Sequence, residues 1–66
     1  MTFKEFIRDN PNRKLILLWF DENTDTLMQE YCKSNRLSSK ARRMIEMEVM
    51  ETETFDDEDW IEVWLR

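Results

Sequence analysis

Carboxylates are the side chains of this sequence with the greatest capacity for chemistry, and they are concentrated toward its end. Between Met44 and Arg66 the chain has nine acidic residues and one basic residue. Carboxylates can bind hard cations, transfer protons, or attract a basic surface on another macromolecule. Because like charges repel, such a concentration often serves a charged partner. The acids are Glu46, Glu48, Glu51, Glu53, Asp56, Asp57, Glu58, Asp59 and Glu62.

The other residue types argue against catalysis. The sequence has no histidine, so the commonest general base and metal ligand is missing. Cys32 is the single cysteine, and Lys33 beside it can lower the pKa of a thiol, but no base completes a nucleophilic pair. Ser38 and Ser39 also lack a histidine partner. We therefore expect no enzymatic activity and no cofactor, with Cys32 as a small, partly buried apolar residue.

The run of acids at residues 56–59 supplies oxygen donors suited to Ca²⁺ or Mg²⁺, but its spacing does not match an EF-hand. The alternating acids, the central glycine and the distal glutamate of that motif are all absent. We interpret this run as a solvated acidic turn, and we predict no metal site.

The overall charge limits the class of partner. The formal net charge is −5, which argues against binding to a nucleic-acid backbone, because such binding needs a positive surface. One segment is basic instead, since residues 33–43 contain five bases and no acid. This segment could pair with the acidic region, or could contact phosphates as an alternative function. The bases are Lys33, Arg36, Lys40, Arg42 and Arg43.

Length and hydropathy predict a single small cytoplasmic domain over residues 1–66. The longest apolar run, residues 15–20, is far shorter than the roughly 20 residues that span a bilayer. No signal-peptide pattern is visible, and a lone cysteine fits a reducing compartment. A chain of this size is marginally stable unless its core is dense or it oligomerises, which makes a homodimer an alternative structural role.

The first half of the chain predicts a helix followed by a strand. Thr2 and Glu5 have the spacing of a capping box, which predicts a helix over residues 2–9 that ends before Pro11. Residues 15–20 are apolar on both parities, which indicates a strand over residues 14–20 that lies near the middle of a sheet and is buried on both faces. Residues 26–32 fit either a helix capped by Thr26 or the return strand of a hairpin. The chain has no glycine, so we expect asparagines to supply left-handed turn conformations. The candidates are Asn10, Asn12, Asn23 and Asn35.

The second half predicts a short helix and a hairpin. Ser38 or Ser39 can cap the helix, with Ala41 and Met44 facing the core. Alternation over residues 45–55 predicts a strand. The change of parity after Val49 indicates either a β-bulge near Met50 or a strand that runs past the edge of the core. In such a strand Glu46 and Glu48 would project from one face about 7 Å apart. Residues 60–65 predict the last strand, with Ile61, Val63 and Leu65 inward.

Several short motifs resemble a loose class of small proteins carried by phages and integrative elements of bacteria. The resemblance rests on residues 2–7, the break at residues 10–12, and the segments 47–49, 55–57 and 61–63. Such proteins look like one helix packed on a short antiparallel sheet, and most have no assigned activity. The resemblance favours the strand over the helix for residues 26–32. It also implies, by analogy with acidic phage inhibitors of host defence enzymes, an inhibitor function.

These observations together predict an α+β fold with a candidate recognition surface. We expect an N-terminal helix and a short second helix on a small antiparallel sheet of three or four strands that ends in a β-hairpin. Trp60 and Trp64 would lie on the sheet face without helices, among the acids, and contact a protein with a basic surface or a second copy. The alternatives are that Arg42, Arg43 or a loop covers the indoles, and that the acids serve only solubility.

Overall fold

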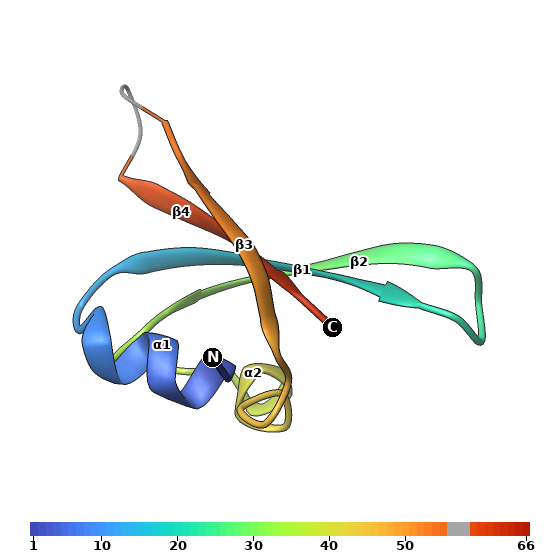
Figure 1. Ribbon diagram of the computed structural model, residues 1–66, viewed down its shortest axis with the longest axis horizontal. Helices are drawn as coiled ribbons and strands as arrows, with labels where there is room; N and C mark the ends of the chain where they lie inside the picture. Colours follow the sequence, from blue (N-terminus) through green and yellow to red (C-terminus); the bar gives the residue numbers. More distant parts are fainter. Residues whose placement is uncertain (56–58) are drawn as a thin grey trace.

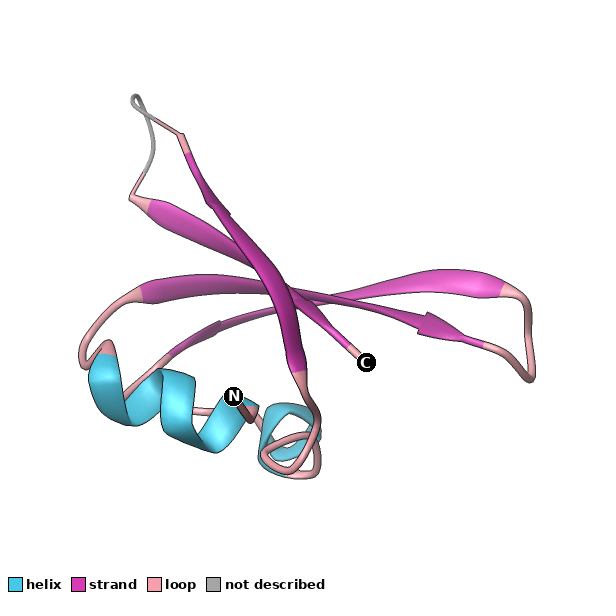
Figure 2. Cartoon of the chain, viewed as in Figure 1, coloured by secondary structure: helices cyan, strands magenta, loops and turns pink. Residues whose placement is uncertain are grey.

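A computed structural model describes residues 1–55 and 59–66 and shows two helices on a four-stranded sheet (Figure 1). Both helices lie on the same side of the sheet, so its other face is not covered by any helix (Figure 2). The strand order is β2-β1-β4-β3. The elements are α1 (Phe3–Asp9), β1 (Lys14–Asp21), β2 (Thr26–Lys33), α2 (Ser39–Arg42), β3 (Val49–Thr54) and β4 (Trp60–Leu65).

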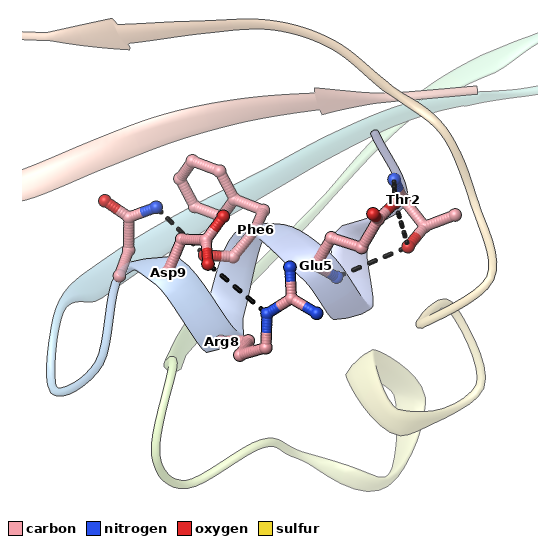
Figure 3. Close-up of polar contacts among 6 residues, drawn as sticks. Thr2, Glu5, Phe6, Arg8 and Asp9 are labelled. Atoms are coloured by element: carbon pink, nitrogen blue, oxygen red, sulfur yellow. Dashed lines mark hydrogen bonds and ion pairs between the residues drawn. The ribbon is translucent and has the colours of Figure 1, made fainter.

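The predicted capping box starts α1. The Thr2 N–H donates to Glu5 Oε1 at 2.8 Å, and the Glu5 N–H donates to Thr2 Oγ1 at 3.3 Å (Figure 3). These two bonds satisfy N–H groups that lack partners at a helix start. The helix ends at Asn10, whose side-chain amide donates to the Phe6 carbonyl. The Thr2 N–H, and after it the Thr2 hydroxyl, holds the pKa of the Glu5 carboxyl below its usual value.

Residues 26–32, which fitted either a helix or a strand, form the return strand of the β1–β2 hairpin. Every residue of β2 from Thr26 to Lys33 pairs antiparallel with β1. The turn between them uses Asp25 at φ 53°, and the loop before β1 uses Asn12 at φ 57°. Asn12 therefore confirms one expected left-handed residue, while Asp25 supplies another that the sequence analysis did not name. Asn10, Asn23 and Asn35 are not in this conformation.

The middle of the sheet is made by the two most apolar strands. β1 lies between β2 and β4, which confirms its predicted central place. β3 and β4 form the predicted C-terminal hairpin and pair antiparallel. The α+β class is thus confirmed, but the sheet is mixed and not wholly antiparallel, because β1 and β4 run parallel. This pairing follows from joining the two hairpins through their more apolar arms, which buries the most apolar surface.

The hydrophobic core lies between the sheet and the helices. Leu15 and Leu17 of β1 and Val63 of β4 are fully buried there, together with Phe3 of α1. α2 begins at Ser38, whose hydroxyl accepts from the Ala41 N–H at 3.1 Å. Ala41, Met44, Phe6, Ile61, Leu65 and Cys32 complete the buried cluster. Neither helix of the described residues has the length and hydropathy that crossing a membrane requires.

The strand predicted over residues 45–55 was wrong in its first part. Residues 43–47 form a turn, and β3 begins only at Val49. The turn is favoured because its carbonyls accept hydrogen bonds from the first N–H groups of α1. The Phe3 N–H donates to the Met47 carbonyl, and the Lys4 N–H donates to the Ile45 carbonyl. Ile45 and Met47 still pack partly against the core. The predicted bulge is confirmed, because the register of β3 against β4 shifts between Val49 and Glu51.

Candidate functional site

The sheet face opposite the helices, called the open face below, presents its side chains in rows that run across the strands. One row contains Gln29, Leu18, Trp64 and Glu51. The next contains Tyr31, Ile16, Glu62 and Glu53. A third contains Lys33, Lys14 and Trp60. On the open face the two central strands thus carry Leu18, Ile16, Trp60 and Trp64 together with Lys14 and Glu62, and β3 carries Glu51 and Glu53.

The two tryptophans lie on the open face as predicted. Trp60 and Trp64 alternate with the buried residues of β4 and are half-buried, so each indole keeps some surface toward solvent. Tyr31 contacts Trp60 edge-on with ring centroids 5.2 Å apart. Lys14 Nζ lies 5.8 Å from the centroid of Trp60, which is a cation–π contact. Both helices lie on the other side of the sheet (Figure 2). The loop before α2 borders one of the rings, because Arg36, Leu37 and Ser38 line a pocket together with Tyr31 and Trp60.

Three carboxylates lie on the same face. Glu51 is directly opposite Trp64, and Glu53 is directly opposite Glu62 on the paired strand. Opposite residues of an antiparallel pair have Cβ atoms about 4.5–5.5 Å apart, and like charges at this distance destabilise a sheet. Glu51 and Glu53 are exposed. The face therefore holds an unfavourable pair of negative charges beside an aromatic surface.

Other acids of the predicted surface lie elsewhere. Glu46 is exposed in the turn before β3, so the expected alignment of Glu46 and Glu48 on one strand face was wrong. Glu48 contacts the ammonium of Met1 at 3.4 Å. Asp59 is exposed just before β4 begins, and its Oδ2 lies 3.8 Å from Lys14 Nζ. The remaining predicted acids, Asp56, Asp57 and Glu58, lie outside the described residues.

Sequence analysis missed the part of the open face that β1 and β2 contribute. Phe20 and Tyr31 are each 55% exposed, whereas Leu18 is only 6% exposed because neighbouring rings and strands cover it. The apolar run of β1 on both parities was the available signal. We interpreted it as burial on both faces, which is confirmed for Leu18 but not for Phe20.

Cys32 packs in the core, whereas the basic segment begins on the open face with Lys33. Burial, and after it the charge of Glu30, raises the pKa of the Cys32 thiol to about 11. The adjacent Lys33 thus does not activate this thiol. The five bases of residues 33–43 are all exposed. Within residues 1–55 and 59–66, the ion pairs join Met1 to Glu48, Arg8 to Asp9 and Lys14 to Asp59, so none involves this segment.

Comparisons with protein-family models, with curated proteins and with solved structures find no match for this chain.

Proposed function

We propose that this protein is a non-catalytic binding module whose open face engages a basic surface on another protein. The observation that carries the proposal is the position of Trp64. It lies between Leu18 on one side and Glu51 on the other, with Glu62 two residues away on the same strand. An indole beside carboxylates suits an arginine or lysine, whose charge pairs with the acids while its stem packs on the ring.

The charge distribution supports a basic partner. Glu53 and Glu62 repel each other in the free protein, and a cation placed between them would relieve that repulsion. Lys14 already stacks over Trp60 within the chain, which gives an internal example of the contact. With a net charge of −5, the protein would also attract such a partner over a distance, so association would be faster at low salt.

The resemblance to small phage proteins suggests a setting for this binding. In that setting the protein is an inhibitor encoded by a mobile element, acts in the cytoplasm, and blocks a basic surface of a host protein. This part of the proposal rests on the resemblance and on the acidic surface.

The test uses two double variants that change the net charge equally. Glu51→Gln with Glu53→Gln removes two charges from the open face. Thr52→Lys with Thr54→Lys adds two charges to the same strand on the opposite face, where both threonines are exposed. Partners are captured from a bacterial lysate at low and at raised salt.

We expect native protein and the threonine variant to retain the same partner at low salt. The glutamate variant should lose most of it, and raised salt should weaken the native complex. Equal retention by all three proteins, or no partner at low salt, would contradict the proposal.

A further inference from the structure

The two outer strands of the sheet differ in how well their free edges are protected. β3 carries a bulge at Met50 and two exposed glutamates, and residues 1–3 cover its start, since the Val49 N–H donates to the Met1 carbonyl. Bulges, charges and covering segments are the usual means of preventing edge-to-edge pairing. β2 is less protected. Its pairing with β1 is continuous, it contains no proline, its charged residues are Glu30 and Lys33, and the chain that follows covers its Lys33 end, where Arg36 forms a bridge with Lys33.

The hydrogen-bond pattern shows which backbone groups of β2 point outward. The Ser34 N–H donates to the Arg13 carbonyl, so this opposite pair is of the hydrogen-bonded type. Because the type alternates along an antiparallel ladder, even-numbered residues of β2 face β1. The backbone groups of Leu27, Gln29 and Tyr31 therefore face outward, as does the Lys33 carbonyl, which accepts from the Arg36 N–H. In the part of the chain described, no backbone bond outside the β1–β2 ladder uses 27, 29 or 31.

We propose that two copies of this chain pair through antiparallel β2 strands about a two-fold axis at Gln29, forming one continuous eight-stranded sheet. In this register Leu27 lies opposite Tyr31 of the second copy, and Gln29 lies opposite its own equivalent. All three residues face outward, so each copy donates and accepts through the same three backbone positions. Leu27 and Tyr31 are each 55% exposed in the single chain, and their side chains would pack together across the new pair.

Charge complementarity selects the antiparallel direction. The hairpin tip next to β2 is acidic, with Asp21, Glu22 and Asp25, and the other end of β2 is basic, with Lys33 and Arg36. An antiparallel pair brings each acidic tip beside the basic end of the second copy. A parallel pair would instead place like charges together.

Neighbouring registers are less favourable. Moving the axis to Glu30 places two glutamates opposite each other and requires the Lys33 carbonyl, which Arg36 already occupies. Moving it to Met28 pairs Tyr31 with Asp25, which has left the strand at φ 53°. The tip of the β1–β2 hairpin projects beyond both helices (Figure 1), whereas the other end of β2 contacts α2.

The proposal is independent of the proposed function, since it uses the edge of the sheet and not Trp64 or the glutamates of β3. Sedimentation at micromolar concentration should show a dimer of the native protein. Gln29→Pro should shift the equilibrium toward monomer by at least about tenfold, because the outward N–H is lost while the bonds to β1 remain. Gln29→Thr, which keeps the N–H, should remain dimeric.

Cross-linking tests the register directly. Hydrogen-bonded opposite residues have Cα atoms about 5.5 Å apart, which suits a disulfide. Gln29→Cys should therefore form a covalent dimer under mild oxidation. Thr24→Cys is the control, because the two copies of residue 24 would be about 30 Å apart.

A monomeric native protein would overturn the proposal. The same holds if β2 pairs only with a strand of a different protein. So would a dimer that survives Gln29→Pro. If that variant does not fold, the cysteine variants decide, and absence of the Gln29→Cys cross-link would count against the register. The glutamate variants of β3 should leave the dimer intact, which separates a failure here from a failure of the proposed function.

Discussion

Replacing one phenylalanine on each side of the sheet tests whether the helical side alone holds the core. Phe6 in α1 is 7% exposed and packs in the core, whereas Phe20 in β1 is 55% exposed on the open face. We expect Phe6→Ala to reduce the free energy of unfolding much more than Phe20→Ala. Alanine is a good helix former, so the first substitution changes packing with little cost in helix propensity.

The expected magnitudes follow from burial. Truncating a core phenylalanine to alanine costs about 3–5 kcal/mol, because a cavity is added to the lost burial. Phe20 is 55% exposed, so a little under half of its surface is buried, and at about 25 cal/mol per Å² this corresponds to roughly 2 kcal/mol. A chain of this length has a total stability of about 3–10 kcal/mol. Phe6→Ala therefore removes much of the stability, and Phe20→Ala removes a small part.

Urea unfolding followed by tryptophan fluorescence measures both effects. With a slope of about 1 kcal/mol per molar urea, the two midpoints should differ by about 2 M. The slope of the unfolding free energy against urea concentration should be the same for both variants, since both unfold from the same native structure. Equal midpoints for the two variants, or a lower midpoint for Phe20→Ala, would refute the assignment of the core to the helical side.

Three further predictions concern Cys32, the capping box of Thr2 and Glu5, and Asn12. Cys32 should react with iodoacetamide at pH 8 roughly 100-fold more slowly in the native protein than in urea, because its raised pKa leaves little thiolate. The raised pKa of Cys32 stabilises the fold fully below the unfolded pKa of about 9, and this stabilisation is lost as pH rises through about 11. In Cys32→Ala the urea midpoint should therefore fall less steeply over this pH range than in the native protein. An equally steep fall would contradict the burial of the thiol. Thr2→Ala should cost about 1 kcal/mol through loss of the helix cap, measured by thermal unfolding. Because the pKa of Glu5 is lower in the folded than in the unfolded state, its carboxylate stabilises the fold above the unfolded pKa, and this effect is lost as pH falls through the folded pKa. The stability of Glu5→Gln should therefore fall less in acid than that of the native protein. Equal acid sensitivity would argue against the capping box. Asn12→Gly should be tolerated, whereas Asn12→Val should lower the melting temperature, because a branched side chain disfavours φ 57°; similar melting temperatures for the two would contradict this.

Local signals predicted the elements well. The capping box of Thr2 and Glu5, the inward positions of Ile61 and Val63, and the bulge near Met50 each depend on residues close in sequence. Such patterns are physical requirements of a single helix or strand, so they can be interpreted without knowledge of the rest of the fold.

Non-local features were not available from the sequence. The parallel pairing of β1 with β4 depends on how two hairpins meet, and no local pattern encodes it. The turn at residues 43–47 forms because its carbonyls accept from the N–H groups of α1, which lies far away in sequence. For this reason Glu46 was assigned to a strand. Only the pairings of β1 with β2 and with β4 place Tyr31 and Leu18 on the same face as the tryptophans.

The parallel pairing at the centre of the sheet has a consequence for folding kinetics. Each hairpin closes a short loop, but Leu17 meets Val63 only when the ends of the chain come together. The chain must lose the conformational entropy of closing this long loop before the contacts between β1 and β4 can form. Docking of the two preformed hairpins should therefore limit the folding rate. Mutations at this central seam should slow folding, whereas mutations near either hairpin tip should mainly speed unfolding.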